Sequence, residues 1–185
     1  DASRPLGLSA DGSTYYFADS TQESVQCITL RDGSCTTLSL AIPEDRRANR
    51  LAYANGRFLC WASDLDSGVL CLFSEDGVPE TSISLPEGQF VIPAALLPAP
   101  DGAHALLTDN GGTAVLADLE TGTLTPLTDA ANGADTRAAW SPDGRLLAYT
   151  QANGIVLCGI DGKRRAGISC GALTPAALYI TEDGD

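Results

Sequence analysis

The sequence predicts an all-β fold built from repeated four-stranded antiparallel units. Three features of the 185 residues lead to this prediction: a tight turn ending in glycine recurs regularly, short apolar segments follow the turns, and no segment has the 3.6-residue apolar spacing of an amphipathic helix. The recurrent turns end 40 to 46 residues apart, at Gly12, Gly56, Gly102, Gly144 and Gly184. A second family of turns keeps step with the first, at Asp32-Gly33, Asp76-Gly77, Thr121-Gly122 and Asp161-Gly162.

The clearest copy of the turn lies in the segment WSPDGRLLAYT, residues 140–150. Pro142 fixes φ at the first central position of a type I turn, Asp143 suits the second, and Gly144 is expected to take the positive φ that closes a hairpin. After Arg145 the segment has no polar alternation, which is typical of a strand covered on both faces. This segment is therefore predicted to be a hairpin whose second strand lies between layers.

Four strands are expected in each repeat, because further turn signals lie between the two families. A four-stranded antiparallel unit that repeats about every 40 to 45 residues is typical of β-propeller blades. A ring of such sheets packs each face against a neighbour, and Trp140 is expected to fill space between two blades. The sequence thus predicts one propeller over 1–185, with residues 40–50 as a linker that contains Pro43. The repeats span approximately 4–45, 46–90, 91–130 and 131–171, and residues 172–185 begin a fifth.

The start of a fifth repeat leaves three arrangements open. In a closed ring of four blades, residues 6–9 and 177–181 would compete for the same place. Either the chain is part of a larger propeller, or a second chain completes the ring, or four blades close and one terminus is displaced. We expect the first arrangement, in which the chain is part of a larger propeller. The sequence contains no Met, so the chain is expected to be a mature or excised piece. Self-association is expected through the open blade faces.

The segment WSPDGRLLAYT, followed by a short strand, Asp161-Gly162 and another strand, resembles the TolB-like, WD-repeat-related β-propeller repeat of bacteria. The resemblance is closest over 138–170; the first and third repeats keep SADG and APDG without the Trp, and the second has only ANG. It implies a non-enzymatic binding or scaffolding module of a bacterial cell-envelope or secreted protein, and hence an extracytoplasmic location. A protein or polymer ligand is expected at the propeller loops. The alternative is the propeller domain of a hydrolase or peptidase, either accessory or with carboxylates at the ring centre.

The net charge of −13 argues against a nucleic-acid partner, since phosphates require a basic surface. The one run of three basic residues, Lys163-Arg164-Arg165, is expected to be a solvated hairpin end. The carboxylates lie mainly in turns, where Asp bonds its own backbone. The sequence has no apolar stretch long enough for membrane insertion.

No catalytic residue, cofactor or metal site is predicted. His104 is the only histidine and lies between apolar neighbours, and there is no G-x-S-x-G motif. Asp64, Asp66 and Glu75 stand at positions one, three and twelve of a calcium loop, but Val69 occupies the position that requires glycine. A plain turn is therefore the favoured interpretation of residues 64–68.

The six cysteines include no C-x-x-C pair and are expected to be free, small apolar residues at blade interfaces. Cys60 and Cys71 would face each other if their hairpin were centred between residues 65 and 66, so a disulfide between them is the alternative. The cysteines are at positions 27, 35, 60, 71, 158 and 170.

Overall fold

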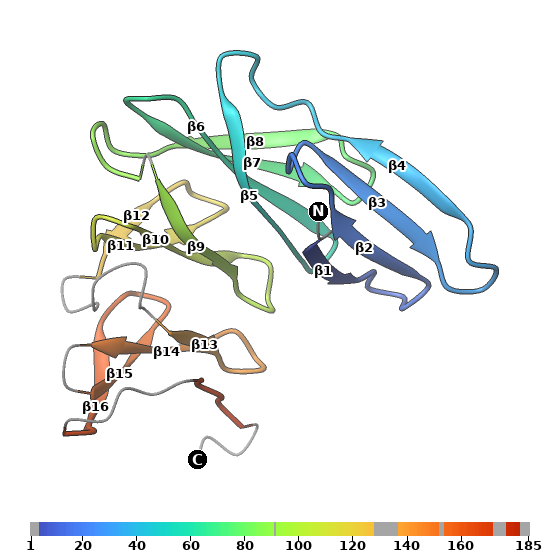
Figure 1. Ribbon diagram of the computed structural model, residues 1–185. Coiled ribbons are helices and arrows are strands. Elements are labelled where there is room, and N and C mark those ends of the chain that lie inside the picture. The colour runs from blue at the N-terminus through green and yellow to red at the C-terminus, as the bar shows by residue number, and fades with distance from the viewer. Residues whose placement is uncertain (1–3, 91, 128–136, 152–153, 172–176, 182–185) are drawn as a thin grey trace. The chain divides into compact units, whose positions relative to one another are not determined.

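The computed structural model describes residues 4–90, 92–127, 137–151, 154–171 and 177–181. Within these residues sixteen strands form four antiparallel sheets of four strands each, in chain order, and there is no helix (Figure 1). The all-β class and the four strands per repeat are therefore confirmed. The chain divides into two compact units, unit 1 (Asp1–Val91) and unit 2 (Ile92–Asp185).

Unit 1 contains the first two sheets. The first sheet comprises β1 (Arg4–Leu8), β2 (Thr14–Ala18), β3 (Ser24–Thr29) and β4 (Cys35–Ser39). The second comprises β5 (Arg47–Ala54), β6 (Arg57–Ser63), β7 (Gly68–Ser74) and β8 (Pro79–Ser84). The edge strands β1 and β5 lie side by side, so the two sheets converge at that edge.

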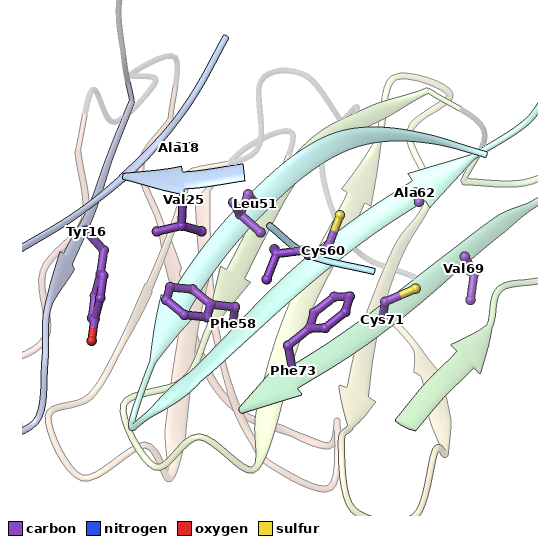
Figure 2. Close-up of a cluster of buried hydrophobic side chains, with 11 residues drawn as sticks. Tyr16, Ala18, Val25, Leu51, Phe58, Cys60, Ala62, Val69, Cys71 and Phe73 are labelled. Carbon is purple, nitrogen blue, oxygen red and sulfur yellow. The ribbon is translucent and has the colours of Figure 1, made fainter. Parts of the chain in front are cut away.

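A buried core joins the two sheets of unit 1 (Figure 2). At its centre the fully buried ring of Phe58 meets Tyr16 of the first sheet at a centroid distance of 5.1 Å and Tyr53 of the second at 5.0 Å. Both tyrosine hydroxyls donate to Glu75 Oε1, at 2.9 and 2.5 Å. Burial, and then the hydrogen bond to Glu75, raises the pKa of both tyrosines, so the hydroxyls stay protonated and keep donating.

A polar contact to β5 also joins the two sheets of unit 1. The N–H of Leu51 on β5 donates to Gln22 Oε1 at 3.2 Å, and Gln22 belongs to the turn between β2 and β3. Gln22 itself has a φ of 63°, an uncommon conformation for a non-glycine residue, and its Nε2 donates to Asp19 O at 3.1 Å. The side chain thus satisfies an edge-strand donor of the next sheet.

Unit 2 contains the other two sheets. The third sheet comprises β9 (Pro93–Pro98), β10 (His104–Asp109), β11 (Ala114–Asp118) and β12 (Leu124–Pro126). The fourth comprises β13 (Ala138–Trp140), β14 (Leu146–Gln151), β15 (Gly154–Gly159) and β16 (Arg164–Ser169). Trp140 lies in the core between them, and its Nε1 donates to Leu97 O of β9 at 3.1 Å. In β14 four consecutive residues, 147–150, are buried, as expected of a strand covered on both faces.

The structure differs from the sequence prediction at residues 40–50. Only 40–46 form a connector, because β5 already begins at Arg47, which pairs with Ser63. The β5–β6 register shifts between Ala48 and Arg50, and Asn49 Nδ2 holds this irregularity by donating to Ser63 Oγ at 2.7 Å and to Arg47 O at 3.0 Å. The bulge lets the β5–β6 pairing continue to Arg47, within a segment whose sequence is typical of a linker.

Residues 177–181, where a fifth repeat is expected to begin, are not in a strand. Tyr179 is 87% exposed, and no strand among the described residues pairs with this segment. A strand requires a ladder partner, so an apolar composition alone does not create one here. Self-association through open blade faces stays a prediction.

In the first repeat, a serine and an aspartate hold the β1–β2 turn together. Ser9 Oγ donates to Asp11 Oδ1 at 2.6 Å, and the same carboxylate oxygen accepts the N–H of Ser13 at 2.9 Å. The N–H of Thr14 donates back to Ser9 Oγ at 2.9 Å. The hydrogen bond from Ser9, and then that from the Ser13 backbone, lowers the pKa of Asp11 to about 2.

The fourth repeat has the same arrangement. Ser141 Oγ donates to Asp143 Oδ1 at 2.6 Å, and the N–H groups of Arg145 and Leu146 donate to Asp143 Oδ1 and Ser141 Oγ at 3.0 and 2.9 Å. The second repeat instead has a two-residue turn of the I′ kind, with φ of 48° at Asn55 and 75° at Gly56. Three further glycines of this turn family also have positive φ: Gly12 at 70°, Gly102 at 70° and Gly144 at 71°. Gly184, the fifth, lies outside the described residues.

The turn aspartates predict a loss of stability in acid. Hydrogen bonds to the ionised carboxylates lower their pKa below the usual value in the folded state, so the unfolded chain takes up protons first as the pH falls. We expect urea-unfolding midpoints to be level above about pH 5 and to fall from about pH 4 towards pH 2. The aspartates concerned are Asp11, Asp32, Asp64, Asp118, Asp143 and Asp161.

The matched variant for this prediction is Asp143→Asn, which removes one of the titrating carboxylates. It should lower the midpoint at neutral pH and flatten the acid slope, because one proton-uptake site is gone. An acid slope identical to that of the parent chain would show that this turn carboxylate does not contribute.

A buried hydroxyl in β10 supplies a second prediction. Thr108 is fully buried, and its Oγ1 has no hydrogen-bond partner among the described residues. Thr108→Val keeps the shape and removes the desolvated hydroxyl, so we expect the free energy of unfolding to rise by about 1 kcal/mol. The control is Thr150→Val, because Thr150 is equally buried but its Oγ1 accepts the N–H of Arg137 at 2.9 Å. That variant should lose about 1 kcal/mol, and changes of the same sign in both would contradict the assignment.

Candidate binding groove

The histidine that the sequence singles out supports a turn. His104 Nδ1 lies 3.1 Å from Asp101 Oδ2, and Asp101 Oδ1 accepts the N–H of Ala103 at 2.8 Å. In the third repeat Ala99 occupies the position of the turn serines, so His104 contacts the aspartate that a serine hydroxyl contacts elsewhere.

The residues with calcium-loop spacing do not form a loop around a metal ion. Asp64 and Asp66 lie in the turn before β7, and Glu75 follows β7. Asp64 Oδ1 accepts the N–H groups of Asp66 and Ser67, both at 2.7 Å, and Arg46 Nη2 lies 3.6 Å from Asp64 Oδ2. Glu75 lies elsewhere, with the two tyrosine hydroxyls. Among the described residues no group of three or more His, Cys, Asp or Glu side chains is arranged to hold a metal ion.

Cys60 and Cys71 are direct cross-strand partners on β6 and β7, as the predicted hairpin requires. Both are buried and free. Burial raises the pKa of both thiols, with the neighbouring Cys71 as a further cause for Cys60, so the reactive thiolate form is disfavoured. They serve as small apolar residues of the core of unit 1.

An open groove lies in unit 1 beside the edge strand β8, with a volume of about 270 Å³. One wall is the connector from β4 to β5, and the floor and the other wall are β7 and β8. The two sheets converge at β1 and β5, and the groove lies away from that edge. Its lining residues are Ala41, Pro43, Cys71, Leu72, Phe73, Pro79, Glu80, Thr81 and Ser82.

The groove combines an apolar floor with a polar rim. Cys71 and Phe73 are nearly inaccessible, whereas Thr81 and Ser82 are exposed. Glu80 Oε2 lies 3.0 Å from Arg57 Nε, so the one carboxylate among the lining residues is paired. Among the strands of the described residues, β8 is hydrogen-bonded to β7 alone, so its other backbone edge is left for a partner strand.

The groove is not predictable from the sequence. The residues that the repeat pattern marks as structural lie in turns and in the core of unit 2, and none lines the groove: Gly12, Gly56, Gly102, Trp140, Pro142, Asp143 and Gly144. The lining comes from three short segments, which only the fold brings together. Pro43 in the connector and Pro79 at the start of the edge strand are the local signals that point to it.

The fold defines the class as an all-β propeller of four-stranded blades, and comparison with solved structures supports this class. A chain of a structure described as "Crystal Structure of Mitotic Checkpoint Complex", a WD40 propeller, matches with a TM-score of 0.65 and 14% sequence identity. The match covers 91% of this chain and 52% of that chain, so the present chain spans about half the length of the chain that it matches. At this identity the similarity shows the fold alone.

The sequence has no match among known families or curated proteins. In the part of the chain that the structure describes, no helix is long and apolar enough to cross a membrane.

Proposed function

We propose that this chain is a non-enzymatic binding or scaffolding propeller module, of the TolB-like kind, from a bacterial cell-envelope or secreted protein. The groove beside β8 is the observation that supports this proposal most directly, because it joins an open strand edge to an apolar floor with a polar rim. The similarity to a WD40 propeller in a protein complex supports a protein ligand. Nothing in the described residues favours the hydrolase or peptidase alternative.

The shape of the groove favours an extended peptide over a small molecule. At about 270 Å³ the groove is smaller than the 300–1,000 Å³ that is typical of small-molecule pockets, and it is open along β8. A peptide that pairs with the free edge of β8 gains main-chain hydrogen bonds, while alternate side chains reach the floor formed by Cys71 and Phe73. The ligand that we propose is therefore an extended peptide segment of a protein partner.

The test is a selection of displayed seven-residue peptides against the purified chain, followed by affinity measurements by fluorescence polarisation. Ser82→Trp fills the groove from its exposed rim. The matched control is Thr37→Trp on β4, an equally exposed edge strand that does not line the groove. Selected peptides should bind Ser82→Trp at least tenfold more weakly and bind Thr37→Trp unchanged. Failure to select any binder, or equal binding to both variants, would reject the groove as the ligand site.

A further inference from the structure

The outermost strand of the fourth sheet, β16, differs from the outer strands of the other three sheets (Figure 1). Among the strands of the described residues, β16 is hydrogen-bonded to β15 alone, and all six of its residues are exposed. It begins with Arg164 and Arg165 and follows Lys163, whereas β4, β8 and β12 contain no basic residue. β16 therefore combines an open backbone edge with a local excess of positive charge, in a chain whose net charge is −13.

The basic residues at β16 are only partly neutralised. Arg165 Nη2 lies 3.0 Å from Asp161 Oδ2, but both side chains are exposed, and an exposed pair of this kind contributes little to stability. Lys163 and Arg164 have no ion-pair partner among the described residues. The Arg164 guanidinium lies over Gly167, in the space that a Cβ there would occupy. Positive charge at this edge is thus left for an acidic partner.

The other end of β16 presents an apolar side chain on the sheet face that turns away from the core of unit 2. Val156 and Cys158 of β15 belong to that core, and side chains alternate along a strand. Ile155 and its cross-strand partner Ile168 therefore lie on the opposite face. Ile168 is 62% exposed. A strand that pairs with β16 can cover Ile168 with an apolar side chain of its own.

The chain contains a segment with the complementary pattern, ALYITEDGD at residues 177–185. Residues 177–181 are not in a strand, and they are alternately exposed and half-buried, with Tyr179 87% exposed. Tyr, Ile and Thr favour strands, and three of the next four residues, 182–185, are acidic. Apolar residues come first in this segment and acidic residues second, whereas β16 has its basic residues first. The two segments therefore match when they run antiparallel.

One antiparallel register satisfies both ends of the match. The opposed pairs are then Tyr179 with Ile168, Glu182 with Arg165, and Asp183 with Arg164. A bulge in the β15–β16 pairing leaves Arg165 as an extra residue, so a regular ladder is expected along 166–169 and charge pairs beyond it. The bulge and the arginines disfavour strands without acidic residues, which makes the edge selective.

We propose that residues 177–185 of a second copy of this chain add to β16 as an antiparallel fifth strand. Main-chain hydrogen bonds hold the strand, and the opposite charges set its direction and register. In the described residues the chain's own segment does not pair with β16, which favours a second copy over a hairpin within one chain. The contact joins two different surfaces, so association is head-to-tail. It is separate from the groove beside β8 and does not depend on the proposed function.

The test measures the mass of the whole chain by light scattering over a wide range of concentrations. The mass should rise with concentration, and sodium chloride should weaken the association, because the charge pairs lie at the surface. Two variants reverse one partner each: Arg164→Glu with Arg165→Glu, and Glu182→Arg with Asp183→Arg. Each should raise the concentration of half-association by about tenfold or more, since like charges then face each other.

Mixing the two reversed variants separates the proposed contact from a general effect of charge. The reversed edge of one variant is complementary to the reversed segment of the other, so an equimolar mixture should associate like the parent chain. The control is Arg31→Glu with Arg145→Glu, which reverses two exposed arginines away from β16 and leaves the proposed contact intact. It should associate like the parent chain.

Three outcomes would overturn the proposal. A parent chain that stays monomeric at every concentration excludes the contact between copies. Equal association of the parent chain and both reversed variants places the contact elsewhere, for example on the open blade faces. Reversed variants that melt at a lower temperature without any change of mass show that the segment pairs with β16 of its own chain.

Discussion

Replacing Phe58 with Ala should lower the free energy of unfolding by about 3–5 kcal/mol. The ring is fully buried at the centre of the core that joins the two sheets of unit 1, and it contacts Tyr16 from one sheet and Tyr53 from the other. Its removal leaves a cavity between surfaces that the surrounding strands hold apart. Urea unfolding followed by tryptophan fluorescence measures the loss, which is large against a typical total of about 5–15 kcal/mol.

The control for Phe58→Ala is Phe17→Ala. Phe17 is a half-buried phenylalanine on β2 whose ring contacts Tyr15 at a centroid distance of 4.7 Å, outside the joint core. Its truncation should cost less than half as much, because part of the ring is already in water. Equal losses in the two variants would contradict the placement of Phe58 between the sheets.

The second large effect is expected at the turn of the fourth repeat. Gly144→Val should destabilise the chain by about 2–6 kcal/mol, of which about 1–3 kcal/mol is backbone strain at positive φ and the rest is overpacking. Gly144 has a φ of 71°, and an added Cβ would lie 3.0 Å from both Cβ and Cγ of Asp101 and 3.1 Å from its backbone N. Thermal and urea unfolding of the purified variants measure the effect.

Two variants separate strain from packing. Gly12 has nearly the same φ, 70°, but a Cβ there would meet no atom within 4 Å, so Gly12→Val should cost only the strain of about 1–3 kcal/mol. Arg145→Lys, beside Gly144 but exposed, should change stability by no more than about 0.5 kcal/mol. Equal losses at Gly12 and Gly144 would show that the turn of the fourth repeat does not pack against Asp101.

The strands and turns could be predicted because their causes are local. Pro142 and Asp143 act on their own backbone, and the apolar run after Arg145 reports burial on two faces without any knowledge of the neighbours. Residues 47–50 lack a local strand signal, because three of the four are polar, and yet they belong to β5. There the pairing of Arg47 with Ser63 and the bulge held by Asn49 decide the structure.

Side-chain roles were less predictable than strands. The spacing of Asp64, Asp66 and Glu75 is that of a calcium loop, but the structure separates Glu75 from the turn and places it against Tyr16 and Tyr53. In the third repeat His104 contacts the turn aspartate, as a serine hydroxyl does in the first and fourth repeats. This role becomes clear only when the contacts of the three turns are compared. In both cases the role of the side chain depends on a contact with a residue outside the sequence motif.

The sequence by itself determined the all-β class, the four strands of each repeat and the position of the turns, because these depend on the backbone preferences of neighbouring residues and on a regular period. Only the tertiary structure decided the groove beside β8 and the difference between Gly12 and Gly144. These features depend on distances between residues remote in the chain. Such distances are set by how one sheet packs on the next, and a repeat period carries no information about them.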